Sequence, residues 1–251
     1  MPVSASLSIA SAAVRAASLD LCSDEYLLLL ARPGEIASVS RLSHDRADSP
    51  LWRRAQSVLA NRGRVEDLIS RRPSLVITMG WGAGRSSLAI ASRMGWRTLA
   101  LPYPATIADV ERNMVRVATA LGEPIRADAW RRKLNALRRA QRPETRDAIY
   151  LGGGGTSQGA GSIGGQWMLL AGLKQRDLPG GRATLELLAT RPPEVILRST
   201  YRHAQPSLGQ RWLDHPLAQR ANARMLITDG RPWTCAGPLM LAEIERLRGA
   251  R

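Results

Sequence analysis

One phrase occurs twice in the sequence, and this repeat limits the possible folds more than any other feature. Residues 65–77 read VEDLISRRPSLVI, and residues 185–197 read LELLATRPPEVIL. In each copy a glutamate, Glu66 or Glu186, stands seven residues before a proline. An apolar run follows the proline, so each copy predicts a helix end, a stop and a buried strand. Copies 120 residues apart are too distant for a solenoid, whose period is about 20 to 50 residues, and favour two similar lobes.

Strands and helices alternate on both sides of the repeat. Strands are expected at residues 14–19, 36–40, 75–77, 96–101, 148–151, 195–197 and 225–228. Helices are expected at residues 24–30, 51–60, 85–94, 107–121, 126–142, 162–170, 211–217 and 239–247. Alternation of this kind is typical of parallel sheets. We therefore predict an α/β protein of two lobes, each a mostly parallel sheet flanked by helices.

The most basic segment, residues 126–142, lies between the two series of strands. Trp130 and Leu134 mark an apolar face on it, and arginines line most of the remainder. We interpret it as one long, rigid helix that joins the lobes, with a DNA-reading basic helix as the alternative. The predicted divisions are an N-terminal lobe (1–122), a connecting helix (123–143) and a C-terminal lobe (144–251).

The net charge of +15 restricts the classes of partner. It is carried almost wholly by arginine, since Lys133 and Lys174 are the only lysines. Such a chain suits nucleic acid, an anionic surface or an anionic small ligand. The arginines are scattered, and the sequence shows no helix-turn-helix signature, zinc-finger spacing or aromatic–basic interleaving. We expect no nucleic-acid partner and keep a basic nucleic-acid-binding protein as the least favoured alternative.

The two cysteines and the start of the chain bear on the compartment. Cys22 and Cys235 form neither a CxxC motif nor a zinc pattern, so pairing in an oxidising compartment and free thiols both stay open. No run of about 18 apolar residues is present to span a membrane. Residues 1–18 lack the basic and apolar regions of a signal peptide.

A glycine-rich motif and three histidines raise catalytic alternatives. Residues 159–164 satisfy GxGxxG, but they follow the preceding strand late, and no acidic residue stands at the ribose position of a dinucleotide site. His44, His203 and His215 show no metal-ligand spacing and no orienting acid. We predict no catalytic residue, no metal and no cofactor. A metal site that involves His44, Cys22 or Cys235 remains a minor alternative.

Polar and aromatic side chains gather in the loops that follow strands. Open α/β sheets bind ligands at these carboxyl ends. The mixture suits a large, partly aromatic, anionic ligand held between two lobes. The candidate ligand-binding residues are Cys22, Ser23, Arg41, His44, Trp81, Tyr103, Thr156, Tyr201, Arg202 and Trp233.

Several segments together resemble one family of transport proteins. Residues 18–45, the first repeat copy, residues 94–124 and the glycine-rich residues 156–173 resemble class III periplasmic substrate-binding proteins of ABC importers. This family includes binders of vitamin B12, ferric siderophores and haem. The resemblance runs from about Ala17 to the end of the chain, and its motifs specify the ligand poorly.

The resemblance implies a cleft between the lobes that changes little on binding, with the His44 region and Trp81 at cleft positions. In the family, one glutamate on each lobe docks onto arginines of the permease, and these positions fall on Glu66 and Glu186. Haem-binding members use a tyrosine or histidine as axial ligand, and this chain does not keep the family's tyrosine near His44. Metal-binding members need several histidines and a carboxylate, a set that is incomplete here.

These observations predict a non-enzymatic, monomeric, periplasmic binding protein. It would hold an iron chelate (siderophore) or cobalamin-type ligand and deliver it to an ABC permease dimer in the inner membrane. Haem is ranked below both ligands. The alternative from another class is a metal-chelatase-like enzyme on a similar two-lobed fold.

Overall fold

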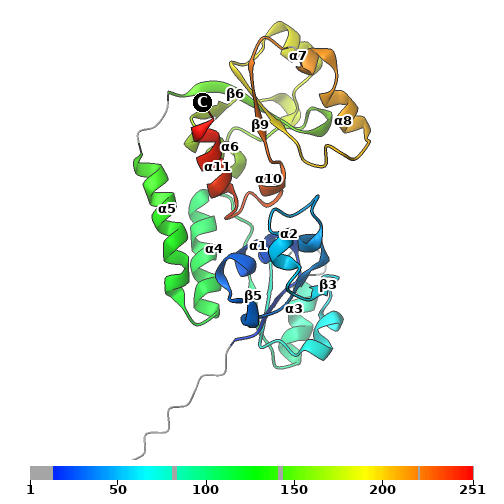
Figure 1. Cartoon of the computed structure of the whole chain (residues 1–251), viewed down its shortest axis with the longest axis vertical. Helices are drawn as coiled ribbons and strands as arrows, with labels where there is room; N and C mark the ends of the chain where they lie inside the picture. The colour runs from blue at the N-terminus through cyan, green and yellow to red at the C-terminus, as the bar shows by residue number, and fades with distance from the viewer. Residues whose placement is uncertain (1–13, 81–83, 141–143, 220, 251) are drawn as a thin grey trace, which may run out of the picture.

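The computed structural model describes residues 14–80, 84–140, 144–219 and 221–250, and it contains two sheets in two lobes (Figure 1). The N-terminal lobe holds a five-stranded sheet in the order β3-β2-β1-β4-β5. The C-terminal lobe holds a four-stranded sheet in the order β7-β6-β8-β9. Every strand pair in these two sheets is parallel, which confirms the predicted fold class.

The element bounds follow the predicted order closely. The strands are β1 Ala16–Ser18, β2 Ile36–Ser40, β3 Ala60–Asn61, β4 Leu75–Thr78, β5 Arg97–Ala100, β6 Arg146–Leu151, β7 Leu173–Gln175, β8 Val195–Ser199 and β9 Arg224–Thr228. The α-helices are α1 Leu21–Leu30, α2 Trp52–Ala55, α3 Gly84–Arg93, α4 Ile107–Ala120, α5 Asp128–Arg139, α6 Ile163–Leu170, α7 Leu185–Thr190, α8 Leu208–Leu213, α9 Pro216–Gln219, α10 Arg231–Cys235 and α11 Met240–Gly249. Short 3-10 helices are η1 Pro33–Glu35, η2 Arg41–His44, η3 Val65–Arg71, η4 Pro124–Ala127, η5 Gly153–Gly155 and η6 Pro179–Gly181.

The repeated phrase occupies equivalent places in the two sheets. Its strand pairs in each lobe with the strand that opens the series, β4 with β1 and β8 with β6. The helical half differs between the copies: the second is the α-helix α7, whereas the first is the 3-10 helix η3, which ends at Arg72 with a φ of 43°. The prediction of an α-helix end in the first copy is therefore wrong, although the strand after it is confirmed.

Capping residues fix where the helices nearest the site begin. Asp20 accepts a hydrogen bond from the Ser23 backbone N–H at 2.8 Å, so α1 begins earlier than the sequence predicted. Thr106 and Asp109 form the expected capping box of α4, because each side chain accepts a bond from the other residue's backbone N–H. Such caps satisfy amide groups that the first turn of a helix leaves without partners.

The basic segment forms a shorter helix than predicted, α5, after the 3-10 turn η4. Figure 1 shows α5 alongside α4, and Arg131 and Arg138 both reach Glu111 of α4. The Trp130 indole N–H donates to the Pro238 carbonyl at 2.9 Å, next to α11. Residues 141–143 lie outside the described residues. That α5 acts as a rigid joint, and that the lobes divide at residues 122 and 143, stay predictions.

Two other predictions about local structure are wrong. The expected helix at residues 51–60 is only the four-residue α2, and the strand β3 begins at Ala60. No helix is expected between the strand at 225–228 and the helix at 239–247, yet α10 lies there; its Pro232 stands in the first turn, where the missing N–H costs nothing.

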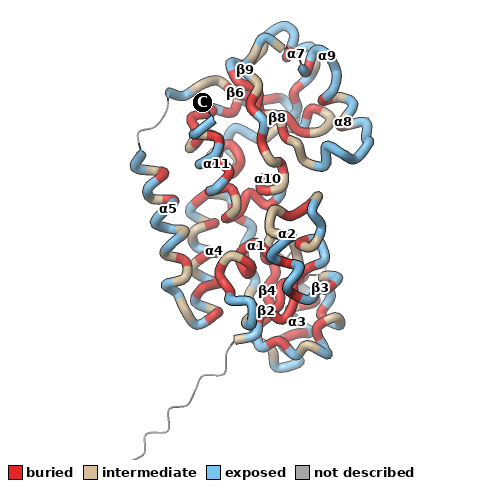
Figure 2. Tube along the Cα trace, viewed as in Figure 1, coloured by how far each residue is buried: buried red, intermediate tan, exposed pale blue. Residues whose placement is uncertain are grey.

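The two lobes share one continuous apolar core. Figure 2 shows buried segments that continue from α1 and α4 to α10 and α11. The cluster includes Leu27 and Met114 in the N-terminal lobe and Trp167 and Met240 in the C-terminal lobe, each at most 1 % exposed. Because interiors are close-packed, a shared core of this kind resists hinge motion between the lobes.

A disulfide between Cys22 and Cys235 joins the start of α1 to the end of α10. The two Cα atoms lie 5.3 Å apart, and the cysteines are 213 residues apart in sequence. Of the two alternatives left open by the sequence, the structure shows the paired cysteines and not the free thiols. The bond connects one lobe to the other.

Replacing both cysteines by serine is expected to lower the free energy of unfolding by up to about 5 kcal/mol, because the disulfide restricts a very long loop in the unfolded chain. Urea unfolding with and without reductant measures this. Reductant should destabilise the parent protein and leave the double serine variant unchanged. Two free thiols in unreduced, denatured protein would contradict the pairing.

Candidate functional site

The carboxyl ends of strands from both sheets lie at the contact between the lobes. Cys22, in α1 directly after β1, is bonded to Cys235 of α10, which follows β9. Asp48, in the loop after β2, pairs with Arg202 in the loop after β8. Ligands in open α/β folds bind at the carboxyl ends of strands, so this contact marks the place to look for a site.

Polar bonds close one side of the contact. Asp48 is 4 % exposed, and its Oδ1 accepts from the Tyr201 hydroxyl at 3.0 Å and from Arg202 Nη2 at 2.6 Å. A further bond comes from Arg231 Nη1, which donates to the Arg46 carbonyl at 2.8 Å. These bonds hold the loop after β2 against the C-terminal lobe.

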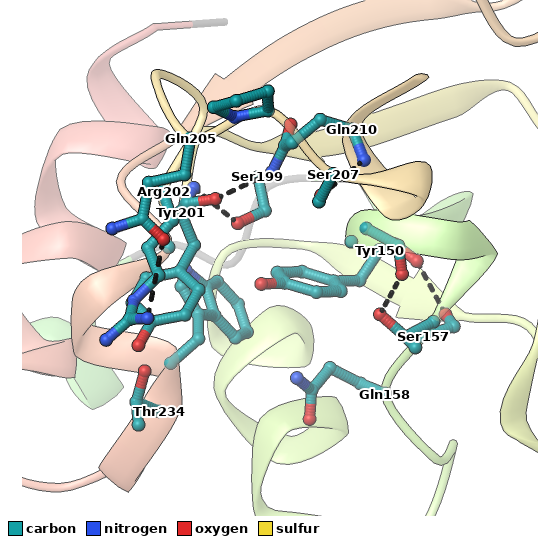
Figure 3. Close-up of a pocket in the computed structure, with 16 residues that line it drawn as sticks. Tyr150, Ser157, Gln158, Ser199, Tyr201, Arg202, Gln205, Ser207, Gln210 and Thr234 are labelled. Atoms are coloured by element: carbon teal, nitrogen blue, oxygen red, sulfur yellow. Dashed lines mark hydrogen bonds between the residues drawn. The ribbon is translucent and has the colours of Figure 1, made fainter. Parts of the chain in front are cut away.

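A cavity of about 470 Å³ opens beside these bonds (Figure 3). In this view the Tyr150 ring extends between Gln210 and Gln158. All the described residues that line the cavity belong to the C-terminal lobe, at the ends of β6 and β8 and in the segments after β6, β8 and β9: Tyr150, Gly152, Gly153, Thr156, Ser157, Gln158, Ser199, Tyr201, Arg202, Gln205, Pro206, Ser207, Gln210, Gly230, Trp233 and Thr234.

Close contacts of Gly230 and hydrogen bonds of Gln210 fix the part of the cavity wall that the segments after β8 and β9 form. A Cβ on Gly230 would lie 2.1 Å from the Ser199 Oγ, so only glycine allows the β9 loop to approach β8 this closely. Ser207 caps α8 by accepting from the Gln210 N–H at 3.1 Å, and the Gln210 amide donates to the Tyr201 carbonyl at 3.0 Å. The loop that carries Tyr201 is thereby held in place.

Two aromatic rings form the base of the cavity. Tyr150 and Trp233 lie with ring centroids 4.9 Å apart, and the Trp233 N–H donates to Thr228 Oγ1 at 2.8 Å. Trp233 is only 5 % exposed, so the expectation of a loop tryptophan is corrected to a buried one on α10. Burial raises the pKa of Tyr150 to about 12, and its hydroxyl is neutral at physiological pH.

Two side chains at the cavity have unused hydrogen-bonding groups. Neither the Gln158 amide nor the Thr234 hydroxyl has a partner within the described part of the chain. Ser157, in contrast, donates to the Tyr150 carbonyl at 2.6 Å and accepts from Gln175 at 3.1 Å, which positions the glycine-rich loop. The cavity therefore presents amide and hydroxyl groups beside aromatic surface.

Four of the ten predicted ligand-binding residues line this cavity: Thr156, Tyr201, Arg202 and Trp233. Among the others, Cys22 is in the disulfide, Ser23 is fully buried in the cap of α1, and Arg41 is exposed on η2. Tyr103 is 44 % exposed after β5. Trp81 lies outside the described residues.

His44 does not line the cavity and is half-buried in η2. Its Nε2 has no partner among the described residues, and burial lowers the pKa of its imidazole, which favours the neutral ring. The minor alternative of a metal site with Cys22 and Cys235 loses both thiolates to the disulfide. Within the residues that the structure describes, no group of three His, Cys, Asp or Glu side chains is placed to hold a metal.

Most of the cavity residues were missed from the sequence. Tyr150 is the penultimate residue of β6, and Ser199 is the last residue of β8. The search for candidate residues covered only the loops that follow strands, and it would have found both if it had included the strand ends. Gln158 and Gln210 gave no signal, because a glutamine in a loop or short helix is ordinarily a surface residue.

Glu66 and Glu186 lie on different lobes, and both are exposed. Glu66 is near the start of η3, and Glu186 is in the first turn of α7, after the Thr184 cap. Neither carboxylate forms a hydrogen bond or ion pair within the described residues. Both are therefore accessible to a partner.

Comparison with solved structures places this architecture among periplasmic binding proteins. The haem-binding protein HutB of Vibrio cholerae is 16% identical, covers 94% of this chain and 98% of its own, and gives a TM-score of 0.71. A haem-binding protein of Pseudomonas aeruginosa is 18% identical, with coverage of 94% and 91% and a TM-score of 0.66. The vitamin B12-binding protein BtuF of Vibrio cholerae is 18% identical, with coverage of 94% and 95% and a TM-score of 0.62.

The chain has the two-lobed fold of these periplasmic substrate-binding proteins. The resemblance drawn from the sequence is confirmed at the level of the fold. No protein-family model matches the sequence, and no curated protein matches it.

A buried acid lies where β1 and β2 end, behind the contact between the lobes. The Asp24 carboxylate accepts bonds from the Ser40 hydroxyl at 2.5 Å and the Ser43 hydroxyl at 2.6 Å, and also from Ser18. Burial nevertheless outweighs these bonds and raises the pKa of Asp24 from 3.8 to about 7. The adjacent Glu25 is also buried, and burial followed by the charge of Asp24 raises its pKa too.

Asp24→Asn is expected to flatten the pH dependence of stability. A raised pKa means that the folded state binds the proton more tightly, so the contribution of Asp24 is greatest at low pH and falls between about pH 4 and pH 7, by on the order of 4 kcal/mol. Denaturant unfolding across this range, compared between parent and variant, measures the difference. Glu245→Gln, at an exposed acid, is the control, and equal slopes for parent and Asp24→Asn would contradict the assignment.

Proposed function

We propose that this chain is the substrate-binding component of an ABC importer, which holds a metal-chelate ligand between its lobes and delivers it to a membrane permease. The fold supports a binding role, since structural neighbours include proteins for haem and vitamin B12. The observation that carries the proposal is the cavity at the strand ends of the C-terminal lobe, beside the contact with the N-terminal lobe, which combines aromatic surface with hydrogen-bonding groups.

The ligand class follows from the side chains at the cavity. Tyr150 stays protonated at neutral pH, and no histidine, cysteine or carboxylate is among the described lining residues. These side chains suit a metal already wrapped by its chelator better than a metal that needs ligands from the protein. An iron siderophore or a cobalamin therefore ranks above haem.

The same observation weighs against a metal-chelatase-like enzyme. Inserting a metal into a macrocycle requires groups that hold the metal and remove protons, and the described lining residues include no base for this task. A binding protein needs only a shaped, polar surface, which the cavity provides.

The disulfide supports a periplasmic location. Structural disulfides persist in oxidising compartments such as the periplasm and are rare in the cytosol. Among the described residues, no helix is both long and apolar enough to cross a membrane. We place the mature protein in the periplasm, as a monomer that meets its permease at the inner membrane.

Glu66 and Glu186 are the proposed contacts with that permease. Each is exposed and unpaired among the described residues, and each stands on its own lobe. A carboxylate in this setting forms a strong, oriented ion pair with an arginine of a partner.

Titration with cyanocobalamin, ferric siderophores and hemin tests the binding role. Trp233 lines the cavity, so ligand entry is expected to change the tryptophan fluorescence saturably and with one-to-one stoichiometry. Absence of binding to every one of these probes would refute the chelate-binding function.

The double variant Glu66→Arg/Glu186→Arg is expected to abolish uptake in cells that carry the cognate permease while ligand affinity stays unchanged. Reversed charge at both points repels the partner's arginines without touching the cavity. Glu245→Arg, at another exposed glutamate, should leave uptake intact. Loss of ligand affinity in the double variant would place these residues in the binding site instead.

A further inference from the structure

The cavity carries little net charge although the chain carries +15. Among its described lining residues, Arg202 is the single charged side chain. The remaining polar groups are hydroxyls and amides, including those of Ser207, Gln205 and Thr234. The charge of the chain as a whole therefore says nothing about the charge of its ligand.

Every nitrogen of the Arg202 guanidinium already has an acceptor. Nε and Nη2 donate to Asp48 Oδ1 at 3.0 and 2.6 Å, and Nη1 donates to the Gln205 side chain at 3.4 Å. These three bonds use three of the five N–H groups of the guanidinium, which leaves one N–H on each Nη nitrogen for a ligand. Because Asp48 already compensates the positive charge, an anionic ligand gains little more at these two N–H groups than a neutral acceptor does.

Burial favours the ion pair of Asp48 with Arg202 over an ion pair of Arg202 with an anionic ligand. Its side chain is 4 % exposed, whereas that of Arg202 is 40 % exposed. Leaving a buried carboxylate without its cation is strongly unfavourable. The Tyr201 hydroxyl also donates to Asp48 and helps to hold it.

The groove on the other side of Arg202 is compensated in charge only in part. It has a volume of about 790 Å³ and is lined by residues of both lobes. Two of its cations, Arg231 and Arg246, pair with Asp229 and Glu243, whereas Arg46 has no ion pair among the described residues. Charge compensation is therefore more complete in the cavity than in this groove.

We propose that the cavity recognises an uncharged ligand surface rich in amide or hydroxamate groups, and that Asp48 sets this specificity by neutralising Arg202. The inference rests on the proposed binding function and reverses the expectation of an anionic ligand. Neutral amide and hydroxyl groups of the ligand exchange hydrogen bonds with Gln158, Gln205 and Thr234, while its apolar surface lies against Tyr150 and Trp233.

Four probes separate the charge classes: cyanocobalamin and ferrichrome are neutral, and ferric enterobactin and hemin are anionic. The parent protein is expected to bind at least one neutral probe about tenfold or more tightly than either anionic probe. Affinity for the neutral probe should be the same in low and high salt, because no ion pair forms. Tighter binding of an anionic probe would overturn this inference and leave the binding function standing, whereas binding of no probe would refute the binding function itself.

Asp48→Asn tests the residue assignment, because it leaves the guanidinium of Arg202 uncompensated. The variant is expected to bind ferric enterobactin or hemin about tenfold more tightly than the parent does, with affinity for the neutral probe changed less than about threefold. Asp214→Asn is the matched control: it removes the carboxylate that pairs with Arg198 and does not line the cavity, so its preference should equal that of the parent.

Equal preference in Asp48→Asn and the parent, with both folded by circular dichroism, would overturn the role of Asp48. A gain for anionic probes in Asp214→Asn as well would assign the effect to the net charge of the protein rather than to Arg202, and would also overturn it. If Asp48→Asn does not fold, the charge preference and salt dependence of the parent protein decide the ligand class.

Discussion

The contact between the lobes is the constraint on which the rest of the structure depends. The Cys22–Cys235 disulfide, the shared apolar core and the bonds from Asp48 hold the carboxyl ends of two parallel sheets together. The cavity lies at the strand ends of the C-terminal sheet, beside this contact. The two exposed glutamates stand one on each of the joined lobes. The proposed binding role would then involve little change of shape, since a packed core across the contact resists opening.

Local pairing across the contact also decides what the cavity can recognise. The sequence alone suggests that Arg202 binds an anionic ligand. In the structure the guanidinium of Arg202 is already paired with the carboxylate of Asp48, more than 150 residues earlier in the chain. The net charge of the chain describes its surface as a whole, whereas the charge of a site depends only on the few groups that line it. The high arginine content is mostly a property of the solvated surface, where salt screens it.

The sequence predicted the fold well because the signals of the fold are local. Buried runs such as Ile36–Ser40, the Thr106 cap and the repeated phrase each depend on residues close together in the chain. The site was predicted in part, since the strand-exit rule found Tyr201 and Trp233 but not Tyr150. What failed depends on tertiary contact. The helix predicted in the first copy of the repeat is a 3-10 helix in the structure. Trp233, predicted in a loop, is buried because it packs against Tyr150. Neither the Asp48 pair nor the disulfide partner has a local signal.

Hydrogen–deuterium exchange with and without a bound neutral chelate, cyanocobalamin or ferrichrome, tests the location of the site most directly. The account predicts slower exchange on binding at residues 152–158, 199–210 and 230–234, which line the cavity, and unchanged exchange at α3 and around Glu66 and Glu186. Protection confined to the outer helices, or around the two glutamates, would contradict the assignment of this cavity as the ligand site.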